Sequence, residues 1–68
     1  MKLKDLLDAL PHEITVRILL FDENGNHLDT FTNRTREISN MYQRYLNNIV
    51  IYYLPLDYVK MDVCIKTN

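Results

Sequence analysis

The chain has 68 residues, 47% of them hydrophobic and only one of them glycine, and its eight basic and nine acidic residues give a net charge of −1. This composition excludes a disordered segment or flexible linker. The only cysteine, Cys64, excludes an internal disulfide and a four-cysteine metal site. Without a signal peptide or a run of about 20 apolar residues, we expect one cytoplasmic domain over residues 1–68 that has no cofactor, metal or membrane partner.

The small size of the chain limits the stability that its core can provide. A domain this short obtains only about 3–5 kcal/mol from its core, and small domains often add disulfides, metals or oligomerisation. Because the first two are not expected, we predict docking on a protein partner or formation of a homodimer.

The first predicted element is a helix over Lys2–Ala9. Leucines at positions 3, 6, 7 and 10 form one apolar stripe, and Pro11 ends the helix. From Glu13 the hydrophobic period changes to two, which predicts a strand. Its inner face carries Ile14, Val16, Ile18 and Leu20, and its outer face carries Thr15, Arg17, Leu19 and Phe21.

The segment Asp22-Glu23-Asn24-Gly25-Asn26 predicts a hairpin turn, for which two registers compete. A type I′ turn at Asn24-Gly25 would pair Leu20 with Asp29. A type I turn with Gly25 in a left-handed bulge would pair Leu20 with Leu28 and turn Asp29 outward. We favour the second register because it keeps a charge out of the core. In that register Phe31 faces outward, while Thr30 and Thr32 face inward.

A second helix is predicted after Thr35, which serves as its N-cap. Its apolar stripe comprises Ile38, Met41, Tyr42, Tyr45 and Leu46. The unbroken apolar run Ile49–Leu54 then predicts a strand buried on both faces. After a break at residues 55–57, a last strand alternates, with Val59, Met61, Val63 and Ile65 inward.

The predicted order is α-β-β-α-β-β, an α+β fold with a four-stranded, mainly antiparallel sheet and two short helices on one face. The first and third strands are the most apolar, so we expect them at the centre. The spatial order is then 2-1-3-4, with the more polar second and fourth strands at the edges.

Catalytic and metal-binding patterns are weak. Asp22, Asn24 and Asn26 have the spacing of a calcium loop, but its required glycine and glutamate are missing. His12 and His27 lack partners at ligand spacing and are expected to be exposed polar residues. No nucleophile motif or glycine-rich loop accompanies them, so we do not expect an enzyme.

Nucleic-acid binding is an alternative function. Arg34, Arg36 and Arg44, with Tyr42 and Tyr45 nearby, could form a weak accessory site for phosphates. However, the near-balance of charges disfavours a concentrated basic surface, and both tyrosines fall on the predicted apolar stripe.

The leading candidate site is a surplus of apolar residues. If both helices cover the inner face of the sheet, the outer face exposes Leu19, Phe21 and Tyr58, with Phe31 as a further member. One of Tyr52 and Tyr53 must join them, because adjacent strand residues point to opposite faces. A contiguous patch of this kind indicates a protein-binding surface.

Several segments resemble one group of proteins. They are the opening Met-Lys-Leu-Lys-Asp-Leu-Leu-Asp-Ala-Leu, the Asp-Glu-Asn-Gly turn, the Tyr-x-x-Tyr-Leu helix end and the closing Val-x-Met-x-Val-x-Ile. Together they resemble small proteins encoded by phages and prophages of low-GC Gram-positive bacteria. The resemblance implies binding to a host or phage protein, and some such proteins inhibit defence systems such as CRISPR nucleases. Our leading hypothesis is therefore a non-enzymatic protein-binding module that acts by steric occlusion.

Overall fold

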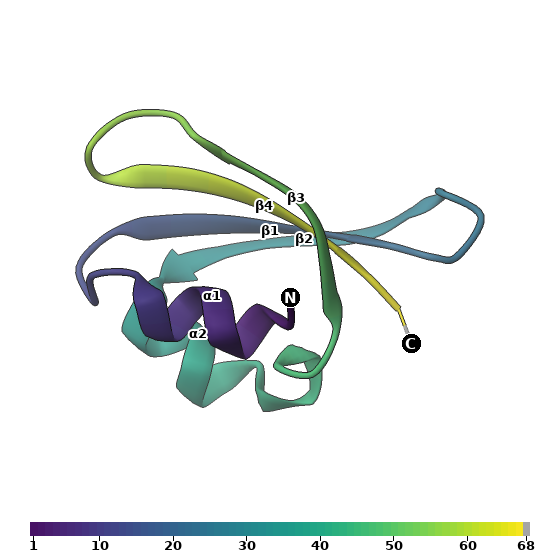
Figure 1. Ribbon diagram of the computed structural model, residues 1–68, viewed down its shortest axis with the longest axis horizontal. Helices are drawn as coiled ribbons and strands as arrows, with labels where there is room; N and C mark the ends of the chain where they lie inside the picture. The colour runs from purple at the N-terminus through teal and green to yellow at the C-terminus, as the bar shows by residue number, and fades with distance from the viewer. Residues whose placement is uncertain (68) are drawn as a thin grey trace.

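A computed structural model describes residues 1–67 and confirms the α+β class and the predicted element order (Figure 1). Both helices cover the same face of the four-stranded sheet. The elements are α1 (Leu3–Ala9), β1 (Thr15–Phe21), β2 (His27–Arg34), α2 (Thr35–Met41), the 3-10 turn η1 (Gln43–Tyr45), β3 (Ile49–Pro55) and β4 (Lys60–Lys66). Across these residues, no helix combines the length and apolar character needed to cross a membrane.

The strand order is β2-β1-β4-β3, so the predicted order 2-1-3-4 is wrong. The sheet is mixed rather than purely antiparallel, because β1 and β4 run parallel at its centre. Their apolar residues match in register, with Val16 beside Met61 and Ile18 beside Val63. The helices cover only one face of the sheet, so a central strand buries side chains on that face alone. The alternating strand β4 fills this position with its one apolar face, and the second apolar face of β3 would gain no burial there.

The core lies between the helices and the inner face of the sheet. The leucine stripe of α1 docks as predicted, and the backbone holds its start against β3, where the Val50 N–H donates to the Met1 carbonyl oxygen at 2.8 Å. Asn48 also accepts a hydrogen bond from the Leu3 N–H. The buried hydrophobic residues are Leu3, Leu6, Leu7, Val16, Ile18, Leu20, Ile38, Met61, Val63 and Ile65.

The β1–β2 hairpin confirms the favoured turn but not the favoured register. Gly25 has φ +86°, and its N–H donates to the Asp22 carbonyl oxygen at 3.1 Å, as expected for a type I turn followed by a left-handed residue. However, a second irregularity follows, and Leu20 pairs with Asp29 instead of Leu28. Asp29 stays exposed because the hairpin extends past the helices (Figure 1).

This second irregularity reverses the faces of β2, because one extra residue in a strand moves each later side chain to the opposite face. Phe31 therefore pairs with Ile18 on the core face, and the predicted outward orientation is wrong. Its ring stacks on Tyr42 at a centroid distance of 4.2 Å and on Tyr45 at 5.3 Å.

The second helix is shorter than its apolar stripe suggests. Thr35 is buried inside the helix rather than acting as its N-cap, and its hydroxyl donates to the Ile14 carbonyl oxygen at 3.4 Å. The helix ends at Met41, and Tyr42 adopts φ −123° and ψ 44°. This break turns the chain so that Tyr42 and Tyr45 both reach Phe31. Met41 is left 61% exposed, so its predicted core position is wrong.

Candidate protein-binding surface

Exposed apolar side chains concentrate in one segment of the chain. Eight of the eleven exposed large hydrophobic residues found among residues 1–67 lie between positions 49 and 59. We call this set the apolar margin: Ile49, Ile51, Tyr52, Tyr53, Leu54, Leu56, Tyr58 and Val59. The sheet order explains its exposure, because β3 is an edge strand with a neighbour on only one side.

The predicted burial of β3 on both faces is therefore wrong. Its residues in the apolar margin are each between 44% and 56% exposed, and only Val50 packs against the core. Val59, predicted to lie inward in the last strand, is also exposed, because β4 begins at Lys60.

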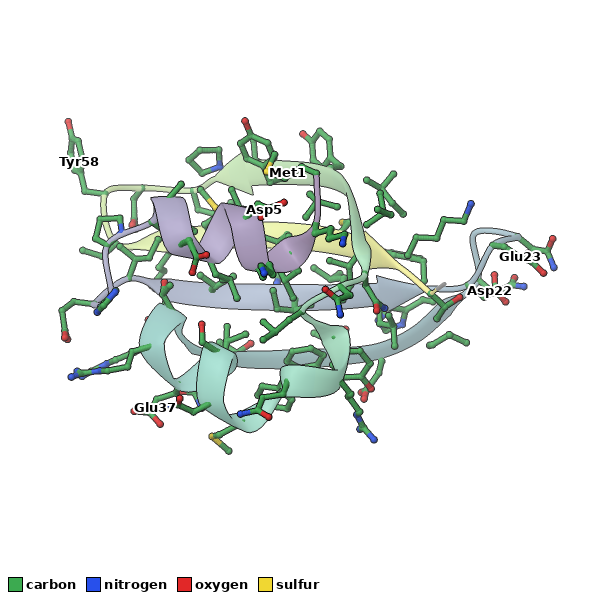
Figure 2. All side chains as sticks on the ribbon, turned by 60° about the horizontal axis from the view of Figure 1, so that its bottom comes forward. Met1, Asp5, Asp22, Glu23, Glu37 and Tyr58 are labelled. Atoms are coloured by element: carbon green, nitrogen blue, oxygen red, sulfur yellow. The ribbon has the colours of Figure 1, made fainter. Side chains whose placement is uncertain are left out.

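The loop after β3 presents the end of the margin to solvent. The Leu56 N–H donates to the Lys60 carbonyl oxygen at 3.0 Å, and the Asp57 carboxylate accepts from the Val59 N–H at 2.7 Å. These bonds fix a short turn, from which the fully exposed Tyr58 points away from the body of the protein (Figure 2).

The outer face of the sheet joins this margin to two predicted site residues. In register across β1, β4 and β3, Leu19 lies beside Cys64, which lies beside Tyr52. Phe21 follows in the next row, and its ring centroid is 5.5 Å from that of His27. Leu19 and Phe21 are half-buried.

The four residues predicted as the protein-binding site thus divide into three positions. Leu19 and Phe21 share the outer face, Tyr58 lies in the loop after β3, and Phe31 lies on the opposite face in contact with the core. Sequence reasoning missed Ile51, Leu54 and Leu56, which it treated as buried strand or as a break. Pro55 was an available signal, because proline in a sheet is confined to edges, strand ends and bulges.

An ion pair limits the apolar surface on the outer face. Two bonds join Arg17 to Asp62: Nε to Oδ1 at 3.0 Å and NH2 to Oδ2 at 2.6 Å. The hydrogen bond and the charge of Asp62 both raise the pKa of Arg17 above its ordinary value, so the guanidinium stays charged. Beside it, Leu56 from the margin lines a shallow depression of about 340 Å³, with Thr15, Arg17, Thr32, Lys60, Met61 and Asp62.

Cys64 lies in the middle of this face, but its chemistry does not favour nucleophilic attack. Partial burial raises the pKa of its thiol above the ordinary value, and the Asp62 carboxylate raises it further, against a smaller opposing effect of Arg17. The thiol is therefore protonated near neutral pH, whereas a reactive cysteine is a thiolate.

The histidines are exposed, as predicted. The His27 Nε2 and the Thr30 Oγ1 lie 2.6 Å apart on β2. Within residues 1–67, no group of three or more His, Cys, Asp or Glu side chains is arranged to hold a metal ion.

The arginines of the alternative nucleic-acid site do not form a purely basic patch. Arg34 and Arg36 both contact the Glu13 carboxylate, at 3.5 Å and 2.8 Å. The guanidinium of Arg44 instead stacks over the Tyr45 ring, 4.9 Å from its centroid. Glu13 therefore offsets part of the charge that would attract a phosphate.

Comparison of the chain with family models, with curated proteins and with solved structures gives no match.

Proposed function

We propose that the protein is a non-enzymatic protein-binding module and that the apolar margin is its contact surface. The observation that carries this proposal is the concentration of eight exposed apolar side chains between residues 49 and 59. Exposed apolar side chains gathered along one edge strand and the turn that follows it are typical of an interaction site. Three of the eight are tyrosines, a residue type enriched at protein interfaces and at their energetic centres.

The position of the margin suits a partner that approaches from the β3 edge. Tyr58 projects from the turn at one end (Figure 2), and Leu56 lines the depression beside Arg17 and Asp62. Tyr52 continues onto the outer face beside Cys64 and Leu19. A partner would thus meet a large aromatic anchor and a flatter apolar area next to it. The Arg17–Asp62 pair and Lys60 supply a polar rim.

The resemblance to phage and prophage proteins extends the proposal to the kind of partner. A bacterial host protein in the cytoplasm is then the expected target, and a defence protein such as a CRISPR nuclease is the specific candidate. With principal extents of 32 × 22 × 19 Å, the module would act by steric occlusion of the surface on which it docks.

Capture from a bacterial lysate by immobilised variants tests the surface. The double variant Leu56→Asp/Tyr58→Asp places two charges in the turn of the margin. The matched control, Leu28→Asp/Met41→Asp, changes side chains that are also at least half exposed but lie outside the margin. We expect the wild type and the control to retain the same captured protein and the margin variant to lose it. Equal capture by both variants would refute the proposed surface.

A further inference from the structure

We propose that the free backbone edge of β3 pairs with β3 of a second copy of this chain, antiparallel and centred on Tyr53. The result is a two-fold dimer with a continuous eight-stranded sheet. This inference rests on the proposed function, because it names an occupant for one part of the apolar margin. It leaves the turn at residues 56–59 and the outer face of each copy open to another partner.

The backbone of β3 has hydrogen-bonding groups directed away from β4. The Leu56 N–H donates to Lys60 at the start of β4. Because N–H groups of alternate strand residues point to the same neighbour, those of Leu54 and Tyr52 also face β4. The N–H and carbonyl of Tyr53 then point to the free edge. An antiparallel strand with Tyr53 opposite Tyr53 would exchange two hydrogen bonds there.

The N-terminal segment limits the pairing to Ile51–Pro55. Lys2 forms an isolated bridge with Ile49, and the Met1 carbonyl already accepts the Val50 N–H, so the beginning of the edge is occupied. Figure 2 shows Met1 beside β3.

With Tyr53 on the two-fold axis, Tyr52 lies opposite Leu54 of the second copy. The strand is irregular between Val50 and Tyr52, so Ile51 borders this ladder and does not extend it. Cross-strand pairs of aromatic and aliphatic side chains are favourable contacts in a sheet.

Charge distinguishes this edge from the other edge of the sheet. Residues 45–56 contain no acidic residue, basic residue or histidine. On β2, by contrast, His27, Asp29 and Arg34 are all exposed. Natural proteins often block edge strands with charged side chains, and β3 has none, while Pro55 and the irregularity at Ile51 restrict the free edge to a short stretch around Tyr53. Two copies of β3 can therefore approach each other without like-charge repulsion.

The available area favours a second copy in a reversible equilibrium. The four margin residues within the paired segment, Ile51–Leu54, are each about half exposed, and together they offer on the order of 450 Å². Two copies would bury up to about 900 Å², which is below the area of stable interfaces and typical of a weak, transient one. We therefore expect dissociation in the micromolar range, so that the average mass depends on concentration.

Sedimentation velocity tests the inference. The chain concentration is varied from about 5 μM to 1 mM, a range that brackets micromolar dissociation. We expect the mass to rise from that of one 8.2 kDa chain toward that of two. Tyr53→Lys and Tyr53→Glu each place like charges across the two-fold axis, so each variant alone should dimerise at least about tenfold more weakly. Their equimolar mixture should restore the two-chain mass, because opposite charges then face each other.

Leu28→Lys is the matched control, since it adds a charge to the opposite edge strand at a side chain 52% exposed, and it should dimerise like the wild type. Far-UV circular dichroism of the separate variants checks that they are folded. A one-chain mass for the wild type at every concentration would overturn the inference, as would a mixture no heavier than its components. If the wild type is monomeric while lysate capture still depends on Leu56 and Tyr58, self-pairing fails and the proposed function stands.

Discussion

Replacing Ile38 by valine tests how the second helix is attached to the sheet. Ile38 is the only large apolar side chain of α2 that is fully buried, whereas Met41, three residues later, is 61% exposed. Deleting one methyl group from a packed core costs about 0.5–1.5 kcal/mol. In a domain of this size, 1 kcal/mol lowers the melting temperature by about 4–8 °C. The alanine variant would lose about 2–5 kcal/mol, comparable to the total of about 3–5 kcal/mol expected from so small a core.

Urea denaturation and thermal melting followed by circular dichroism would measure both effects. We expect Ile38→Val to show a clear loss of stability and Ile38→Ala to be largely unfolded at 37 °C. Met41→Ala should change the free energy of unfolding by no more than about 0.5 kcal/mol. Equal losses for Ile38→Val and Met41→Ala would refute the reasoning, because they would place both residues on the buried stripe.

Four further substitutions test the hairpin and the reversed faces of β2. Phe31→Ala should destabilise the protein by about 2 kcal/mol, because it removes two stacked ring contacts, whereas Thr32→Ala on the outer face should be nearly neutral in the same urea titration. Gly25→Ala should cost about 1 kcal/mol through its positive φ alone, since no atom lies within 4 Å of the added Cβ; an unchanged unfolding midpoint would contradict this. Hydrogen bonds from the Asn26 backbone and side chain lower the pKa of Asp22, so its stabilising effect is present above the ordinary carboxyl pKa of about 3.9 and disappears as the pH falls through the lowered value. The stability difference between wild type and Asp22→Ala should therefore narrow below about pH 4 in a pH series of thermal melts, and a constant difference would exclude this linkage.

The ends of helices and turns could be predicted from the sequence, because they depend on residue types close together in the chain. Pro11 ends the first helix, and Gly25 takes the left-handed position of the turn. The extra residue near Leu28 carries no comparable signal, because nothing in its side chain favours a bulge. A single unpredicted residue thus reversed the expected face of Phe31.

The strand order depends on long-range matching that a single strand does not encode. The apolar run of β3 suggested a central position, but only one face of this sheet is covered. For the candidate site, the same error hid Ile51 and Leu54. Leu19 was correctly expected on the outer face, and of the pair Tyr52 and Tyr53, which the sequence left open, Tyr52 lies there. The composition of the surface was thus predictable in part, and its location was not.

The parallel pairing of β1 with β4 has a consequence for synthesis. Residues 15–21 gain their central neighbour only from residues 60–66, 45 positions later in the chain. Contacts between such distant segments slow folding, since a long loop must close before they form. On the ribosome, β1 would have to wait until translation had passed residue 66, with Val16 and Ile18 still lacking their β4 neighbours. A nascent chain in this interval is the form most exposed to aggregation and to chaperones.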